Sequence, residues 1–522
     1  MKHAPLLMLG WAAALLLAFH PMLLSGLAQV PGDLGDARLV NYLLEHGWLW
    51  LLHQPLHQDF WSPPIFYPAA NTAAYSDLLI TAGPFYWCWR AVGLPMDTAF
   101  QLWLLTISSL NYLAMYAFLG RVLRLRTLAA ALGAVLFTAG NSRVAEIVHP
   151  QLYIHFYSVV AVYGLVRFFE TTEAPPTGRM RPWLWLGVFC LAAVLQIYAS
   201  YYLGWFLGLG VLVAGAVACA RGPTRRGLFA VRKRQRWTVC AWTGATAVLV
   251  APLAWHYLLA AREVGMRNWG AAGLPSPWAW FILDPTSWLY GRLTFLQAAP
   301  GAPGLDQLGV GFLAPALAVW GLWRRRRSPI FYYLLWTAVA LVMLVTTVGP
   351  VTLWIVVYGC VPGAAALRAA YRVCLVVLFV IAAGAACFVE DRKRVWTAAV
   401  LALLCVLEQG RTPPTFSKEE SRRRVAELAA RIPPGGAAFL YTPRGDPDSF
   451  LERAFVQVDA MWAELETGEP TVNGYSGAVP PDYAFVAPII RDEDDLEERQ
   501  KALNEWCERH GKNPATVVWI HD

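Results

Sequence analysis

The chain has 522 residues, of which 57% are apolar, 13% aromatic and only 15% charged, and its formal net charge is +7. A soluble globular domain usually has about 25% charged and about 45–50% apolar residues, so this composition excludes most soluble folds. Uncharged runs of about 20 residues recur along most of the chain, and runs of that length predict transmembrane helices.

The chain changes character near residue 411. Residues 1–410 contain 29 Lys and Arg against 15 Asp and Glu, whereas residues 411–522 contain 13 against 20. The basic clusters lie between apolar runs, where they orient a membrane protein and do not indicate nucleic-acid binding. We therefore predict an all-α transmembrane domain at 1–410, followed by a small C-terminal α/β domain at 411–522.

About eleven transmembrane helices are predicted. They cover 5–28, 98–120, 127–141, 151–169, 183–200, 201–220, 237–260, 308–323, 330–349, 372–389 and 395–409. The first apolar run exceeds the about 7–15 residues of a signal peptide, so we expect it to be retained as a span. Two further apolar stretches, 78–92 and 351–362, are predicted to lie in the membrane interface without crossing it.

The connections alternate between strongly basic and weakly charged segments, and the positive-inside rule assigns the basic ones to the cytoplasm. The N-terminus is then inside, and the C-terminal domain is extracytoplasmic. The predicted outer loops are 29–97, 142–150, 261–307 and 350–371.

The C-terminal domain has clear helix and strand patterns. Helices are predicted at 417–431, 449–466 and 493–510, and strands at 437–441 and 515–520. The glycines of the NGYSG segment at 473–477 predict a structural turn, at the face by which this domain docks.

The ionisable residues collect in the predicted outer loops, and no span has an acidic residue at mid-depth. Because a coupled transporter usually places one near the midplane, this distribution favours a site at the outer membrane surface. Asp33 and Asp36 are the candidate catalytic residues. Asp36 has two interpretations, a helix N-cap or a general base, and the pair is also a candidate for holding a divalent cation.

Other polar residues of these loops are candidate substrate-binding groups. Glu146, His149 and Gln151 are suited to a sugar hydroxyl or a phosphate, or simply line the loop. Arg368 and Arg372 are four residues apart, so on one helical face they would clamp a lipid phosphate or anchor the headgroup region.

The sequence resembles the GT-C superfamily of polyprenyl-phosphate-dependent glycosyltransferases, which includes protein O-mannosyltransferases, the lipid A aminoarabinose transferase and oligosaccharyltransferases. Asp36-Ala-Arg38, followed by Glu45-His46-Gly47-Trp48, is similar to the Asp-Glu-x-Arg and Gly-x-Trp of many bacterial members. The run GDLGDARLVNYLLEHGW, with FWSPPIFYP and NTAAYSD, also looks like a group of uncharacterised bacterial membrane proteins placed with that superfamily. Ala37 stands where the familiar pair has Glu.

The resemblance implies a GT-C-like fold and a glycosyltransferase of the bacterial cytoplasmic (inner) membrane. Its partners would be a polyprenyl-phosphate sugar donor, membrane lipid and a glycan, lipid or protein acceptor. Asp36 would be the general base of an inverting reaction, and Arg38, Glu45 and His46 would line the substrate site. No metal ligands are assigned, and a divalent cation (Mg²⁺ or Mn²⁺) remains an open alternative. Two other functions are also open, a transporter or flippase of a lipid-linked glycan and a non-catalytic scaffold that presents the C-terminal domain.

Overall fold

The computed structural model describes residues 4–173, 181–221, 235–265, 268, 270, 272–293, 295, 307–443, 450–483, 485–486 and 493–521. The basic segment 222–234 and parts of the predicted outer loop 261–307 lie outside the described residues.

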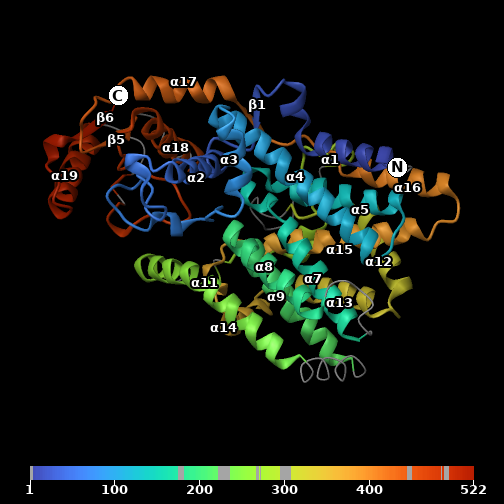
Figure 1. The fold of residues 1–522 in the computed structure, drawn as a ribbon. Coiled ribbons are helices and arrows are strands. Elements are labelled where there is room, and N and C mark those ends of the chain that lie inside the picture. The colour runs from blue at the N-terminus through green and yellow to red at the C-terminus, as the bar shows by residue number, and fades with distance from the viewer. Residues whose placement is uncertain are drawn as a thin grey trace.

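The described chain is mainly helical, and a helix lies at each of the eleven predicted spans (Figure 1). These helices are α1 (Ala4–Leu24), α4 (Met96–Arg121), α5 (Thr127–Ala139), α7 (Phe156–Glu173), α8 (Pro182–Ala199), α9 (Tyr201–Ala220), α11 (Arg236–Val264), α12 (Leu313–Arg325), α13 (Pro329–Val345), α15 (Cys374–Glu390) and α16 (Val395–Glu408). Eight helical segments among the described residues are long and apolar enough to cross a membrane, and α13 and α16 are shorter apolar helices. The chain is a multi-pass membrane protein, and the number of eleven spans stays a prediction.

Both stretches predicted to lie in the interface form helices too short to span. Helix α3 (Gly83–Ala91) has 9 residues and α14 (Trp354–Cys360) has 7. At 1.5 Å per residue, α3 is about 14 Å long, against about 30 Å of hydrocarbon. A short antiparallel pair, β2 (Thr347–Val348) and β3 (Val351–Thr352), precedes α14.

Helices α12 and α15 cross at two glycines. A Cβ on Gly321 would lie 2.3 Å from the backbone oxygen of Gly384, and a Cβ on Gly384 would lie 2.6 Å from that of Ala318. Helix association in lipid depends on such small residues, because lipid supplies no hydrophobic force between helices. The two glycines therefore set the closest approach of α12 and α15.

The ends of the helices that adjoin the predicted outer loops gather at one face of the molecule. Arg372, before α15, forms an ion pair with Glu146, after α5. The carboxylate of Asp77, in the first outer loop, accepts a hydrogen bond from the Tyr201 amide at the start of α9. At the end of α16, Glu408 accepts bonds from three amides at the start of α12. The structure thus brings three of the predicted outer loops together, and the assignment of this face to the outside stays a prediction.

The C-terminal part has the predicted helices and strands, and it lies on this same face. Its elements are β4 (Thr415–Ser417), α17 (Lys418–Ala429), β5 (Ala438–Thr442), α18 (Phe450–Thr467), α19 (Glu493–Arg509) and β6 (Val517–His521). Strands β5 and β6 pair in parallel, whereas β4 pairs antiparallel with β1 (Gln29–Pro31) of the first outer loop. In Figure 1 the orange and red helices α17, α18 and α19 lie above and to the left of the blue helix α2 (Asp36–Leu51).

Replacement of Gly384 by Ala should destabilise the α12–α15 crossing. The new methyl group meets the backbone of Ala318, which cannot rotate away, so we expect a loss of about 1–3 kcal/mol of stability. Thermal unfolding in detergent measures this loss. Gly208→Ala in α9 is the matched control, because a Cβ there meets nothing within 4 Å. Equal melting temperatures for the two variants would contradict the prediction.

Candidate functional site

The site begins at the first turn of α2, where Asp33 and Asp36 have different tasks. Asp33 Oδ1 accepts hydrogen bonds from the amides of Gly35 and Ala37, at 3.2 and 3.1 Å. It therefore satisfies amides that a helix start leaves free. Asp36 is the first residue of the helix and caps nothing. The N-cap interpretation of Asp36 is wrong, and its carboxylate is available for other contacts.

A chain of contacts runs from Asp36 to Arg372 through two side chains. Asp36 Oδ2 lies 3.0 Å from His149 Nε2, and His149 Nδ1 lies 3.2 Å from Glu146 Oε2. The same Glu146 oxygen lies 3.5 Å from Arg372 Nε. These residues come from α2, the segment after α5 and the segment before α15. The structure thus brings together four of the residues that the sequence singled out.

The two ends of this chain differ in exposure. The Asp36 and His149 side chains are 26% and 23% exposed, whereas Glu146 and Arg372 are each 9% exposed. Burial raises the pKa of Asp36, but bonds to His149 and Tyr475 and the charge of Arg372 outweigh it and leave this pKa below its ordinary value. Burial and Arg372 lower the pKa of His149, yet its contacts with Asp36 and Glu146 bring it above its ordinary value. The solvent-facing end is therefore an ionised carboxylate.

Arg368 and Arg372 both contact Tyr202, at the start of α9. The Arg372 guanidinium lies 4.7 Å from the centroid of the Tyr202 ring, and the Arg368 amide donates to the Tyr202 hydroxyl at 2.9 Å. The prediction of one shared helical face is wrong. Arg368 precedes a short 3-10 turn (Ala370–Val373) that contains Arg372, and α15 begins only after it.

Asp77 is a buried carboxylate of the site that sequence reasoning missed. It lies within the electrostatic range of Arg372, Arg368 and His149. Burial raises its pKa to about 6, although the Tyr201 amide and these cations oppose the shift. Its only signal in the sequence is its place among the ionisable residues of the first outer loop.

Tyr475, from the NGYSG segment, is a second residue that was missed. Its hydroxyl hydrogen-bonds to Asp36, and Asp33 and Arg368 are close enough to influence it. The segment was predicted to be a turn at the docking face, and no local pattern links it to Asp36.

Gln151, two residues after His149, has an unsatisfied hydrogen-bond acceptor. Its Oε1 is buried and has no hydrogen-bond partner among the described residues. Buried polar atoms are nearly always paired, so this oxygen is suited to a bound polar group.

The described residues do not fit a divalent cation. Within them, no group of three or more His, Cys, Asp or Glu side chains is arranged to hold a metal ion. Asp36 and Glu146 contact opposite nitrogens of His149, so their oxygens do not converge on one point. We therefore derive no step through Mg²⁺ or Mn²⁺.

Arg38, Glu45 and His46 require a correction, because the structure gives all three other buried partners. Arg38 forms an ion pair with Asp459 of α18. Glu45 accepts two bonds of 2.8 Å from Arg90 of α3. His46 contacts His57 and the Phe60 carbonyl, at 2.9 and 3.1 Å. Glu45 and His46 are satisfied within the protein, whereas Arg38 Nε and Nη2 are buried and have no hydrogen-bond partner among the described residues. Because all three side chains are buried against other parts of the protein, we assign them to the packing of α2.

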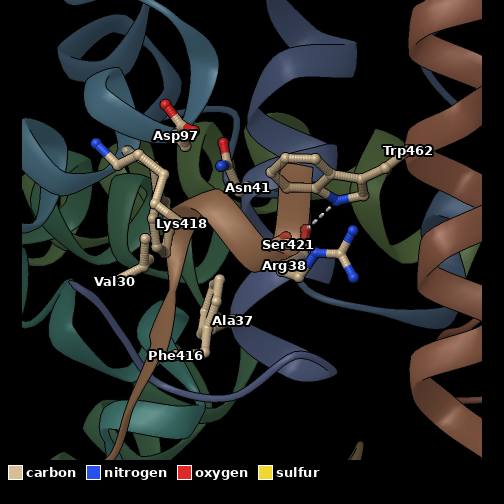
Figure 2. A pocket seen from close by; sticks show the side chains of 10 residues that line it. Val30, Ala37, Arg38, Asn41, Asp97, Phe416, Lys418, Ser421 and Trp462 are labelled. Carbon is tan, nitrogen blue, oxygen red and sulfur yellow. Dashed lines mark hydrogen bonds between the residues drawn. The ribbon is translucent and has the colours of Figure 1, made fainter. Parts of the chain in front are cut away.

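A small cavity lies where α2 and α4 meet the C-terminal part (Figure 2). It is lined by Val30, Ala37, Arg38, Asn41, Asp97, Phe100, Phe416, Lys418, Ser421 and Trp462. The Trp462 indole donates to the Arg38 carbonyl at 3.2 Å (Figure 2). Outside the lining, Arg422 pairs with Asp97 at 2.6 Å. Arg38 and Asp97 in the lining thus have charged partners, and Lys418 donates to the Thr98 hydroxyl at 3.1 Å. Asp36 and His149 are not among the lining residues.

Solved structures share this architecture, although no family model and no curated protein matches the sequence. The oligosaccharyltransferase of Archaeoglobus fulgidus in its apo form matches with a TM-score of 0.52 and 12% identity, over 90% of this chain and 64% of that chain. AglB of the same organism, in complex with an inhibitory peptide and a dolichol-phosphate, matches with a TM-score of 0.54 and 12% identity, over 97% of this chain and 68% of that chain. Mycobacterial arabinofuranosyltransferase AftD gives 0.48 and 15% identity, over 84% and 29% of the two chains.

The fold is therefore shared with the archaeal oligosaccharyltransferase, and oligosaccharyltransferases are one of the groups that the sequence resembles. At 12% identity the likeness establishes the fold, and the chain spans less than two thirds of the apo oligosaccharyltransferase. Substrates and activity are properties of the site and need their own argument.

Asp77 should make the fold less stable as the pH rises from 4 to 7. A carboxyl with a pKa of about 6 in the fold and 3.8 in the free state stabilises the fold while it is protonated. This contribution is complete below about pH 4 and is lost as the pH passes through about 6. Asp77→Asn keeps an acceptor for the Tyr201 amide and does not titrate.

The measurement is the melting temperature of the wild type and of Asp77→Asn at several pH values between 4 and 7. We expect the melting temperature of Asp77→Asn, relative to that of the wild type, to increase with pH throughout this range. A difference that does not change with pH would contradict the prediction.

Proposed function

We propose that this protein is an inverting glycosyltransferase, which moves a sugar from a polyprenyl-phosphate donor to an acceptor on the outer face of the bacterial cytoplasmic membrane. The observation that carries the proposal is the arrangement of one partly exposed carboxylate, Asp36, and one buried guanidinium, Arg372, at the ends of a four-residue chain. The fold of oligosaccharyltransferases supports it. The acceptor is a hydroxyl of a glycan or lipid, or a protein side chain.

The reaction follows from the charges. An acceptor hydroxyl attacks the anomeric carbon, a new carbon–oxygen bond forms, and Asp36 takes the proton. The bond between the anomeric carbon and the phosphate oxygen breaks on the opposite face, and its electrons leave with the polyprenyl phosphate. Phosphate is a good leaving group, so one base suffices without a matching acid.

Arg372 and Arg368 stabilise the charge that develops on the leaving phosphate. Arg372 is held by Glu146 and lies against the Tyr202 ring, so it is oriented before the substrate binds. A preoriented donor in a site shielded from water stabilises such a charge far more than solvent does. A lipid-linked donor would enter this face laterally from the membrane, between helices.

Asp36→Asn should abolish sugar transfer. An amide cannot accept the proton, and a general base contributes about 10²–10⁴ to a rate, so release of polyprenyl phosphate should fall by at least about 10²-fold. The assay offers a panel of polyprenyl-phosphate sugars to the purified protein in lipid, with membrane extract as the source of acceptors.

Asp59→Asn is the matched control in the same loop. Asp59 accepts one bond from the Trp61 amide, at 3.0 Å, which an Asn side chain retains, so this variant should release polyprenyl phosphate as the wild type does. No release from any donor by the wild type would refute the proposal and favour a transporter or a scaffold. Full release by Asp36→Asn would refute Asp36 as the base.

Arg372→Lys should lower kcat more than it raises KM. Lysine keeps the charge but loses the planar fork that meets both Glu146 and a phosphate. We expect a fall in kcat of about 10-fold to 10²-fold, since one donor to a developing oxyanion contributes about 10²–10³ and the retained charge restores part of it.

Arg90→Lys is the control for Arg372→Lys, because Arg90 also pairs with a buried carboxylate, that of Glu45, at 2.8 Å. Its kcat should equal that of the wild type. A rise in KM with unchanged kcat for Arg372→Lys would mean that Arg372 binds the donor without stabilising the leaving group.

A further inference from the structure

The segment 473–477 of the C-terminal part is attached by its backbone to the first outer loop. The Phe66 amide donates to the Asn473 carbonyl at 2.9 Å, and the Tyr67 amide donates to the Thr471 carbonyl at 3.0 Å. In return, the Thr471 amide donates to the Pro64 carbonyl at 3.1 Å. Because backbone bonds fix the register of two segments, the register of 471–473 against 64–67 is defined.

The same segment is equally well held from the C-terminal side. Asn473 is fully buried. Its side-chain nitrogen Nδ2 donates to the Tyr441 carbonyl and to Gln457 Oε1, at 2.9 and 3.0 Å. The Gly474 amide donates to the same Gln457 oxygen at 3.2 Å. Strand β5 and helix α18 thus fix the start of the segment, so its tip cannot move independently of the C-terminal part.

The tip of the segment reaches the cluster around Asp36. The Tyr475 hydroxyl bonds to Asp36, as described above. Two residues later, Gly477 lies so close to the first outer loop that a Cβ would be 2.1 Å from the Tyr75 carbonyl and 3.0 Å from Arg368 Nη2. One short segment therefore contacts both the carboxylate and an arginine of the site.

We propose that the segment 473–477 is a part of the catalytic site, in which Tyr475 is a positioning residue for Asp36. This inference rests on the proposed function. His149 holds Asp36 from the transmembrane part, and Tyr475 holds it from the C-terminal part. Two donors fix the plane of the carboxylate. Because a carboxylate can accept about four hydrogen bonds, it can still accept one from the hydroxyl of the sugar acceptor.

The electrostatic consequence has a definite sign. The ionisable groups that face Asp36 are Asp33, His149 with Glu146 behind it, Arg372 and Tyr475. A hydrogen bond donated to the ionised carboxylate stabilises that form, so loss of the Tyr475 hydroxyl raises the pKa of Asp36. Transfer needs ionised Asp36, and the acid limb of the pH–rate profile should then move to higher pH.

The experiment compares Tyr475→Phe with Tyr42→Phe. Tyr42 donates to the buried carboxylate of Glu464 at 2.8 Å, so it joins α2 to α18 by the same kind of bond without touching Asp36. Release of polyprenyl phosphate is measured between pH 4 and 9. For Tyr475→Phe we expect the acid limb to shift upward by up to about one pH unit, and for Tyr42→Phe we expect no shift.

A second readout does not depend on activity. The carboxyl stretching band of Asp36, identified by infrared difference against Asp36→Asn, is titrated in the wild type and in Tyr475→Phe. A higher pKa of Asp36 in Tyr475→Phe supports the inference, even where no donor is turned over. In that case only the proposed function fails. An unchanged titration or an unchanged acid limb overturns the inference.

Gly477→Ala tests the segment without altering a titratable group. The added methyl group meets the Tyr75 backbone and should displace the tip, so the acid limb should move in the same direction as for Tyr475→Phe. Gly436→Ala, where the nearest atoms lie 3.4 Å away, is the control. If a folded Gly477→Ala variant has its acid limb at the same pH as the wild type, the tip has no part in the site.

Discussion

Lipid excludes unpaired charge, and this constraint determines where the chain can place a site. Ionised side chains are expensive in hydrocarbon, so they occur at the ends of spans or in pairs. Glu146 and Arg372 follow both rules, since they adjoin different spans and pair with each other. Breaking a buried pair by removing one partner typically costs about 3–5 kcal/mol, because the other charge is left alone. The contact that would orient Arg372 in the proposed reaction is thus the same contact that joins two segments of the membrane part.

The C-terminal part is fastened by the same principle on the other side of α2. Arg38 pairs with Asp459, and the Arg38 guanidinium lies 4.7 Å from the centroid of the Trp462 ring. Strand β4 also pairs with β1 before the first residue of α2. Helix α2 is therefore enclosed between the spans and the C-terminal part. The composition changes near residue 411, and the elements on the two sides of this change share one polar interface.

The positions of the helices could be predicted because a helix that crosses lipid must be apolar over its length, which composition records locally. The sequence singled out Asp36 and His149 as candidates because they lie among the ionisable residues of the predicted outer loops, and the structure brings the two into contact. Their partners could not be predicted. Arg38 has the same character as a candidate in the same loop, yet its partner Asp459 is 421 residues away and its guanidinium is buried. Tyr475 is joined to Asp36 by the packing of two distant segments, which leaves no pattern in either one.

The geometry also distinguishes four carboxylates as candidates for the proposed base. Asp33 is occupied by two backbone amides, and burial raises its pKa, so it is the poorer candidate for an ionised group. Asp77 is buried, accepts the Tyr201 amide and has a pKa of about 6. Glu146 is nearly inaccessible between His149 and Arg372. Asp36 combines partial exposure with a lowered pKa, and an acceptor hydroxyl must meet an ionised oxygen that faces water. Of these four carboxylates, Asp36 alone meets both requirements.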